Sequence, residues 1–353
     1  MTKLRMIVYV LAILLGATAS AESGASKAKP LFSSDDLLEV TIKGPFTTIM
    51  KERELDEEQP AVLTFNDAEA GEVSVEIEVR TRGRFRRQSK VCKWAPLRLN
   101  FKKSTVKKTE FAGADKMKLV THCRNGSQRY TQSILSEYLA YRILNTITDA
   151  SFRVRLLRIT YVDTDKGDRE RTELGFIIEH KSQLAKRLDL DVNEAKETEI
   201  ELLDGRYTNL TSLYQYLIGN TDFSPIRAAP DEPCCHNYML FGSEPGQILP
   251  IPYDFDMSGI VDAPYAEPNA RFGLRSVRER LYRGRCRNNE HMATSVQAFL
   301  DKKSAIYDLV NGNEFYKSKT RDATLRFLNS FYETISDPKR VQEKLIDNCL
   351  GRG

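Results

Sequence analysis

The residues best suited to chemistry lie between positions 222 and 256, in the second half of the chain. Asp222 follows the end of a predicted helix, Asn237 precedes a predicted strand, and Asp254 and Asp256 follow the next strand. Glycines between the two strands mark a turn, so a hairpin would return the chain and set Asn237 beside Asp254. An amide oxygen and one or two carboxylates at one point form the hard oxygen site that Mg²⁺ or Mn²⁺ accepts.

These residues also have a plainer interpretation, because acidic turns after strands are common. The Asp-x-Asp pair alone therefore indicates little, and the prediction depends on its combination with Asn237 at hairpin spacing and Asp222 upstream. Asp222, which arrives from the end of a helix, would be free to orient a nucleophile. His236 is interpreted as a structural neighbour of Asn237 and not as a metal ligand.

Hydrophobic periodicity predicts the elements that must position these groups. Alternation of apolar and polar residues predicts strands at 38–42, 61–65, 73–79, 97–101, 153–162 and 173–180. Helical spacing predicts helices at 127–145, at 210–218 with Gly219 as a left-handed cap, and over much of 290–349.

A mainly β half followed by a mainly helical half predicts an α+β protein of two lobes with a cleft between them. We expect a mainly β N-terminal lobe with one helix at 35–180. A mainly helical C-terminal lobe, which contains the metal-site hairpin, is expected at 181–353.

Two charged residues in the N-terminal half stand where they could face such a cleft. Arg98 alternates with the apolar residues of its strand, so it offers a cation on the opposite face. Glu137 lies close to the apolar stripe of the 127–145 helix, where an acid is costly unless a cation meets it. The alternative for Glu137 is a boundary position from which the carboxylate reaches water.

The N-terminus has the features of an export signal. Lys3 and Arg5 precede an apolar run at 6–15, and small residues follow up to Ala21. This pattern predicts a signal peptide at 1–21, cleaved after Ala21, and then a flexible polar leader at 22–34. The apolar run is too short to span a membrane. We therefore expect a secreted or periplasmic protein without a membrane span.

Composition narrows the class of protein further. The chain has 353 residues, of which 41% are hydrophobic and 29% charged, so it can bury a substantial core. Its net charge of +4 would fall to +2 on loss of the signal peptide's two cations, because 4 − 2 = 2. Such a balance gives no electrostatic reason to expect binding to nucleic acid.

The chain contains six cysteines, and an even number in an oxidising compartment indicates disulfides. We expect Cys92 to pair with Cys123. The other four would then tie the Cys234–Cys235 loop to Cys286 and Cys349. Zinc binding is the rival interpretation, but the sequence contains no C-x-x-C pair.

The order of these motifs resembles the catalytic half of the protein-kinase fold, in which a helix leads to a base Asp and a metal-binding Asn, and a hairpin leads to a metal-binding Asp. More closely, the chain is similar to the CotH kinase family, whose members are secreted or spore-coat proteins with an atypical protein-kinase-like fold. The similar stretches are RTRGR at 80–84, PLRLNF at 96–101, LGFIIE at 174–179, HNY at 236–238 and PYDFD at 252–256.

The resemblance implies a two-lobed protein-kinase-like fold that binds ATP with Mg²⁺ or Mn²⁺. It implies that Asp222 is the catalytic base, that Asn237 and Asp254 are metal ligands, and that Asp256 is an additional ligand or a supporting group. On the cofactor side, the resemblance implies that Arg98 is a phosphate-binding cation and that Glu137 is its partner on the helix. It also implies that Glu179 lies at the junction of the lobes and that Arg82 provides a guanidinium beside the phosphates.

The sequence departs from the kinase pattern in three ways. Asp222 and Asn237 are 15 positions apart, where ordinary kinases separate this pair by about five. The acidic motif ends in Asp256 and not in glycine. No glycine-rich loop is present, so the arginine-rich segment at 82–87 would have to bind the phosphates, although a solvated basic hairpin explains it equally well.

Three functions follow as hypotheses. The first is an exported, CotH-like kinase that transfers a phosphoryl group from ATP to a hydroxyl of a protein or small molecule. The second is a secreted scaffold or binding protein without catalytic activity. The third is a metal-dependent phosphoester hydrolase that uses Asp254, Asp256 and His236 as ligands. The sequence favours an enzyme without deciding the matter.

Overall fold

The computed structural model describes residues 29–228 and 234–351. The predicted signal peptide and most of the predicted leader lie outside the described residues. The leader's last residues are packed, because Pro30–Phe32 forms a 3₁₀ helix (η1) in which Leu31 and Phe32 are buried.

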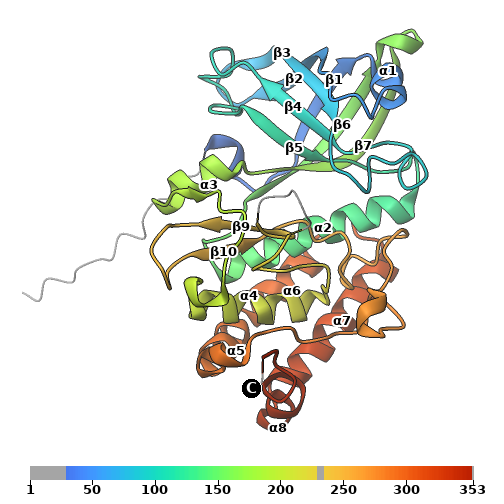
Figure 1. Cartoon of the computed structure of the whole chain (residues 1–353). Coiled ribbons are helices and arrows are strands. Elements are labelled where there is room, and N and C mark those ends of the chain that lie inside the picture. The colour runs from blue at the N-terminus through green and yellow to red at the C-terminus, as the bar shows by residue number, and fades with distance from the viewer. Residues whose placement is uncertain (1–28, 229–233, 352–353) are drawn as a thin grey trace, which may run out of the picture.

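Seven strands form a closed barrel in the N-terminal half of the protein (Figure 1). The strands are β1 (Leu38–Gly44), β2 (Gln59–Asp67), β3 (Gly71–Thr81), β4 (Leu97–Phe101), β5 (Lys116–Val120), β6 (Val154–Asp163) and β7 (Arg169–Ile178). Apolar residues alternate along them and face the interior, as in β1, where Leu38, Val40 and Ile42 are buried.

The predicted two-lobed protein-kinase-like fold is wrong, because the N-terminal sheet closes on itself. β1 pairs antiparallel with β2 on one side and parallel with β6 on the other, in the order β1-β2-β3-β4-β5-β7-β6. Closure leaves the sheet without a free edge. Alternation in the sequence specifies which side chains point inward, but it does not specify which distant strand pairs with the first.

The C-terminal half is mainly helical and packs below the barrel (Figure 1). Helix α2 (Gln128–Ile147) contacts β6 and β7 on one side and α6 on the other. Helix α1 (Phe46–Lys51) lies beside the barrel and contacts β3 and β6. The remaining helices are α3 (Lys181–Leu188), α4 (Gly205–Ile218), α5 (Met292–Asp301), α6 (Lys303–Asn311), α7 (Ser318–Ile335) and α8 (Pro338–Val341). Apolar residues form one core inside the barrel and a second core among these helices.

A small three-stranded sheet lies between the barrel and the C-terminal helices. It consists of β8 (Val192–Asn193), β9 (Tyr238–Phe241) and β10 (Leu249–Pro252), in the order β10-β9-β8. β9 and β10 form the predicted hairpin, with Tyr238 opposite Pro252. This register places the residues before β9 next to those after β10.

Three disulfides are present among the described residues, and two of them link distant parts of the chain. Cys92 is bonded to Cys123, as predicted. The predicted link from the Cys234–Cys235 loop to the C-terminal cysteines is wrong, because Cys234 and Cys235 are bonded to each other and Cys286 is bonded to Cys349. The described cysteines include none that is free.

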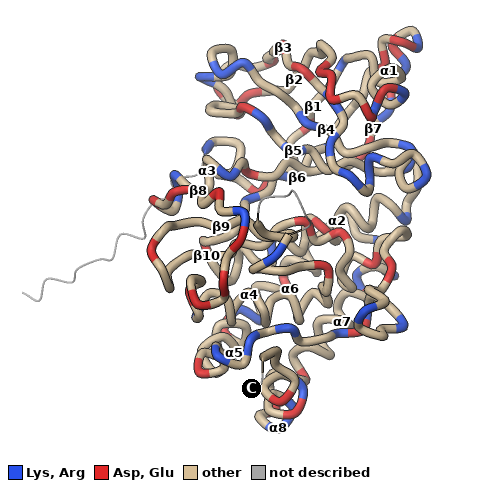
Figure 2. Tube along the Cα trace, in the orientation of Figure 1, with Lys and Arg blue, Asp and Glu red and all other residues tan. Residues whose placement is uncertain are grey.

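Charges of both signs are interspersed over the barrel and the helical part (Figure 2). Among the helices that the structure describes, none is both long enough and apolar enough to cross a membrane.

Candidate functional site

A cavity of about 610 Å³ lies between the barrel and the β9–β10 hairpin. Residues from the loop after β3, from β5, from the segment after α4 and from both ends of the hairpin line it. Four of them are the acid and amide groups singled out in the sequence: Asp222, Asn237, Asp254 and Asp256.

Asp222 is held by the turn that ends α4. Gly219 caps this helix with φ +65°, and the Asn220 side chain then accepts a hydrogen bond from the backbone N–H of Asp222 (2.9 Å). The Asp222 carboxylate pairs through Oδ1 with His236 Nε2 (2.8 Å) and accepts from Asn237 Nδ2 through Oδ2 (3.1 Å). Its orientation is therefore fixed by neighbours on the strand side of the cavity.

The hairpin places Asn237 and Asp254 side by side. The backbone N–H of Tyr253 donates to the carbonyl of Asn237 (3.0 Å), and that of Asp254 donates to the Tyr141 hydroxyl (2.9 Å). Asn237 Nδ2 is committed to Asp222, which leaves Oδ1 as its amide atom for a cation. Both Asn237 and Asp254 have left-handed backbone conformations, with φ of 56° and 62°. Non-glycine residues with such φ values cluster at functional sites.

Arg86 lies among three carboxylates at the back of the cavity. Its guanidinium is 3.2 Å from Glu137 Oε2, 3.2 Å from Asp256 Oδ2 and 3.8 Å from Asp254 Oδ1. Arg86, Glu137 and Asp256 are only 7%, 1% and 7% exposed, whereas the Asp254 side chain is 39% exposed. Arg86 thus neutralises the buried acids, and Asp254 remains open to the cavity.

Burial determines the protonation of this cluster. It raises the pKa of Glu137 to about 8, although Arg86 acts in the opposite direction. It also raises the pKa of Asp256 to about 6, where Arg86 lowers it and the Asp254 charge raises it. Glu137 Oε1 is buried and lacks a hydrogen-bond partner within the described residues, whereas Oε2 pairs with Arg86.

Two cations from the barrel face these acids. Lys118 on β5 and Arg82 just after β3 line the same cavity. Burial, assisted by the nearby Arg82 charge and opposed by Asp254, lowers the pKa of Lys118 to about 7. Burial also lowers the pKa of Arg82. The sequence interpretation missed Lys118, although Lys116-Met117-Lys118-Leu119 alternates as a strand should.

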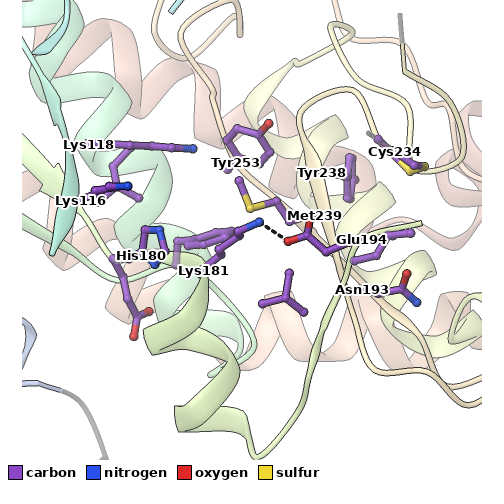
Figure 3. Close-up of a pocket in the computed structure, with 16 residues that line it drawn as sticks. Lys116, Lys118, His180, Lys181, Asn193, Glu194, Cys234, Tyr238, Met239 and Tyr253 are labelled. Carbon is purple, nitrogen blue, oxygen red and sulfur yellow. Dashed lines mark hydrogen bonds and ion pairs between the residues drawn. A yellow bond between two sulfur atoms is a disulfide. The ribbon is translucent and has the colours of Figure 1, made fainter. Parts of the chain in front are cut away.

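A second pocket of about 200 Å³ adjoins the first (Figure 3). Lys118, Tyr253 and Cys235 line both, and Lys118 Nζ lies 4.7 Å from the centre of the Tyr253 ring. The walls of the second pocket are largely apolar, and Lys181 and Glu194 form an ion pair at its edge. Its apolar lining residues include Phe152, Ile178, Val192, Met239 and Leu240.

The remaining predicted site residues have other positions. Arg82 lines the cavity, but Arg98 lies outside it and pairs with Glu58 (2.7 Å). Arg98 on β4 stands directly opposite Lys118 on β5. The two side chains therefore share the face of the sheet on which a cation was expected, but Lys118 and not Arg98 lines the cavity. Glu137, the predicted partner of Arg98, binds Arg86 instead.

Glu179 lies at the junction between β7 and α3, where the sequence interpretation expected it. Its carboxylate is buried and accepts hydrogen bonds from Arg187 (2.9 and 3.1 Å) and from the backbone N–H of Arg153 (3.1 Å). The side chain therefore fixes the start of α3, and its acceptor atoms are occupied.

The donor set suits a divalent ion that shares its coordination with a phosphate. The described residues contain no group of three or more His, Cys, Asp or Glu side chains that could hold a metal by themselves. Mg²⁺ does not require one, because it is usually bound by one or two carboxylates together with water and substrate phosphates. Asp254 and Asn237 Oδ1 fit that role, whereas Asp256 is engaged by Arg86 and by the Tyr265 hydroxyl (3.1 Å).

Comparison with known proteins adds no assignment to this geometry: no family model matches the sequence, and no curated protein matches it significantly.

Proposed function

We propose that this cavity transfers a phosphoryl group from a nucleoside triphosphate such as ATP, with Mg²⁺ or Mn²⁺, to a hydroxyl of a protein or small molecule. One observation carries the proposal: Asp222, Asn237 and Asp254 meet in one cavity, opposite two barrel cations and next to an apolar pocket. Phosphoryl transfer depends mainly on positioning and charge neutralisation, and these groups supply both.

Each residue has a distinct part in this proposal. Asp254 and Asn237 Oδ1 hold the divalent ion, which neutralises charge that develops on the phosphate oxygens. Lys118 and Arg82 bind the phosphates from the barrel side, and the apolar pocket receives the base of the nucleotide. Asp222, oriented by Asn237 and His236, accepts the proton of the acceptor hydroxyl.

The resemblance to the CotH kinase family supports this proposal through residues 222–256 and not through the fold. Export of the protein, predicted from residues 1–21, belongs to the same proposal. Since ATP is scarce outside the cytoplasm, another phosphorylated donor would meet the same requirements of the site.

The other two hypotheses differ in support. The hydrolase required His236 as a metal ligand, but His236 Nε2 is directed at Asp222 Oδ1. A binding protein without turnover has one observation in its favour, because Arg86 already supplies positive charge to Asp254 and Asp256.

The proposal is tested by thermal unfolding of the oxidised protein with Mn²⁺, with ATP and with both. A ligand at 100 times its Kd stabilises the folded state by about 2.7 kcal/mol. We expect stabilisation by the combination, its loss in Asp254→Asn, and its retention in Asp222→Asn together with loss of ADP formation from ATP.

Asp262→Asn is the matched control, because Asp262 is another exposed Asp with a left-handed backbone (φ 48°) outside the cavity. It should respond to ligands as the wild type does. Two results would refute the phosphotransfer proposal. One is stabilisation that persists in Asp254→Asn, and the other is absence of stabilisation with every nucleotide.

A further inference from the structure

The end of the barrel that carries the β6–β7 turn contains another cavity, of about 310 Å³. Its lining shares no residue with either pocket of the candidate site. The residues come from α1, from the segment before β4, from the loop before α2 and from the β6–β7 hairpin. This cavity is therefore a separate feature of the molecule.

Aromatic side chains form the floor of this cavity. Phe46, Trp94 and Tyr161 contact one another, with ring centres 4.9 to 5.3 Å apart. Trp94 Nε1 and Tyr161 Oη are both buried. A side-chain hydrogen bond with Trp94 lowers the pKa of Tyr161, which burial raises. These two polar groups of the floor therefore partner each other.

Cations form the walls. Five of the lining residues are basic: Lys51, Lys93, Lys166, Arg169 and Arg171. Arg171 stands opposite Tyr161 in the β6–β7 register, and Arg169 stands opposite Asp163, so these side chains share the face that meets the cavity. Burial lowers the pKa of His122 to about 4, and the nearby Arg171 charge contributes to this shift.

The nearby carboxylates compensate these cations only in part, because five basic and two acidic residues line the cavity. Asp163 accepts from the backbone N–H and the hydroxyl of Thr47, and Glu173 accepts from the backbone N–H of Gly126. Glu170 is the other acid in the lining. Among the described residues, none forms an ion pair with any of the five basic side chains. In a chain whose charges nearly balance, such a concentration is local, and a concave site focuses its field.

We propose that this cavity binds a phosphate-type oxyanion, either free or carried on a small ester. The basic side chains would neutralise its charge above the aromatic floor. A volume near 300 Å³ lies at the lower end of small-molecule sites, so a diphosphate or a phosphate monoester fits better than a large ligand.

Trp94 provides a direct readout, because it is the only tryptophan in the chain. Inorganic phosphate, pyrophosphate and phosphoserine are titrated separately into the oxidised protein without metal, at constant ionic strength, while tryptophan fluorescence is followed. We expect a saturable change with one ligand per chain. The strongest of the three ligands distinguishes a free anion from an ester.

Variants decide where the anion binds. Arg171→Met should weaken binding about tenfold or more, since a hydrogen bond to a charged group is lost. Lys93→Met removes an exposed side chain and should weaken binding even if Arg171→Met fails to fold. The exposed Lys319→Met, on α7, is the control and should bind as the wild type does.

Three results would overturn the proposal: a linear response that sodium chloride reproduces, binding as strong as in the wild type in both Arg171→Met and Lys93→Met, or loss of binding in Arg82→Met, which changes the phosphotransfer cavity alone. The first two would identify a solvated group of surface cations. The third would place the anion in the phosphotransfer cavity. Because no nucleotide or metal is used, failure here leaves the phosphotransfer proposal unaffected.

Discussion

Replacement of Arg86 by methionine provides the most direct test of the charge arrangement at the candidate site. Met has a similar length, so the variant removes the cation that contacts Asp256 and Glu137 while it keeps much of the volume. Breaking a buried ion pair by removal of one partner typically destabilises a protein by about 3–5 kcal/mol. The question is how that loss depends on pH.

The pKa of Asp256 sets the expected magnitude. At pH 8 this carboxyl, with a pKa of about 6, is ionised beside Arg86. Without Arg86 it would have to bind a proton in the folded state, which costs about 1.36 kcal/mol for each pH unit above its pKa, or roughly 3 kcal/mol at pH 8. At pH 5 Asp256 is already largely protonated, and this contribution vanishes.

The sign follows from linkage. Burial raises the pKa of Asp256 in the folded state above its unfolded value, so its contribution to stability is lost as the pH rises through the folded pKa. Removal of Arg86 raises that pKa further and extends the loss to higher pH. The difference in unfolding free energy between wild type and Arg86→Met should therefore grow from pH 5 to pH 8.

Urea denaturation of both oxidised proteins at pH 5 and pH 8 measures this difference. Arg87→Met is the matched control, because the neighbouring arginine pairs with Glu54 and Asp56, which are 68% and 70% exposed, and such surface pairs contribute about 0–1 kcal/mol. The double variant Arg86→Met/Asp256→Asn should recover most of the loss at pH 8. Equal destabilisation at both pH values would show that Arg86 does not maintain an ionised Asp256.

Three further predictions concern the nucleotide site, the junction and the C-terminal disulfide. Phosphates beside Lys118 would raise the pKa of this side chain from about 7, so ATP binding at pH 8 should be accompanied by uptake of nearly one proton. Calorimetry in two buffers measures this uptake, and Lys118→Arg should show no uptake. Absence of proton uptake in the wild type would mean that the phosphates bind elsewhere. Glu179→Gln leaves the Arg187 charge buried without a counter-charge and should destabilise the protein by about 3–5 kcal/mol in urea denaturation, whereas a loss below about 1 kcal/mol would make the pair dispensable. Replacement of both Cys286 and Cys349 by serine opens a link across 63 positions and should lower the unfolding free energy by about 4 kcal/mol; an unchanged urea midpoint would contradict the chain-entropy argument.

Strand positions could be predicted from the sequence wherever apolar residues alternate over several positions. This worked for the long strands and for the hairpin that sets Asn237 beside Asp254. It failed for β5, although this strand has the same length as the predicted β4 and alternates at its start. The cation on this strand, Lys118, was missed together with it.

Pairing between distant strands could not be predicted. Arg98 was expected at the site because its face of β4 was correctly identified as the polar one. In the structure Glu58, 40 positions earlier in the chain, neutralises Arg98, and Arg86 takes the place beside Glu137. Local sequence patterns carry no information on which of several arginines meets a particular acid.

Closure of the barrel likewise depends on a distant contact. The parallel pairing of β1 with β6 joins residues that are more than 100 positions apart, and this contact distinguishes a closed barrel from an open lobe. The sequence by itself determined the inward-facing residues of the long strands, the hairpin and the group of oxygen donors at its ends, because these depend on periodicities of two to four residues. Only the tertiary structure decided the closure of the sheet, the disulfide partners of the last four cysteines and the cation that each buried carboxylate meets, because those depend on which distant surfaces pack together.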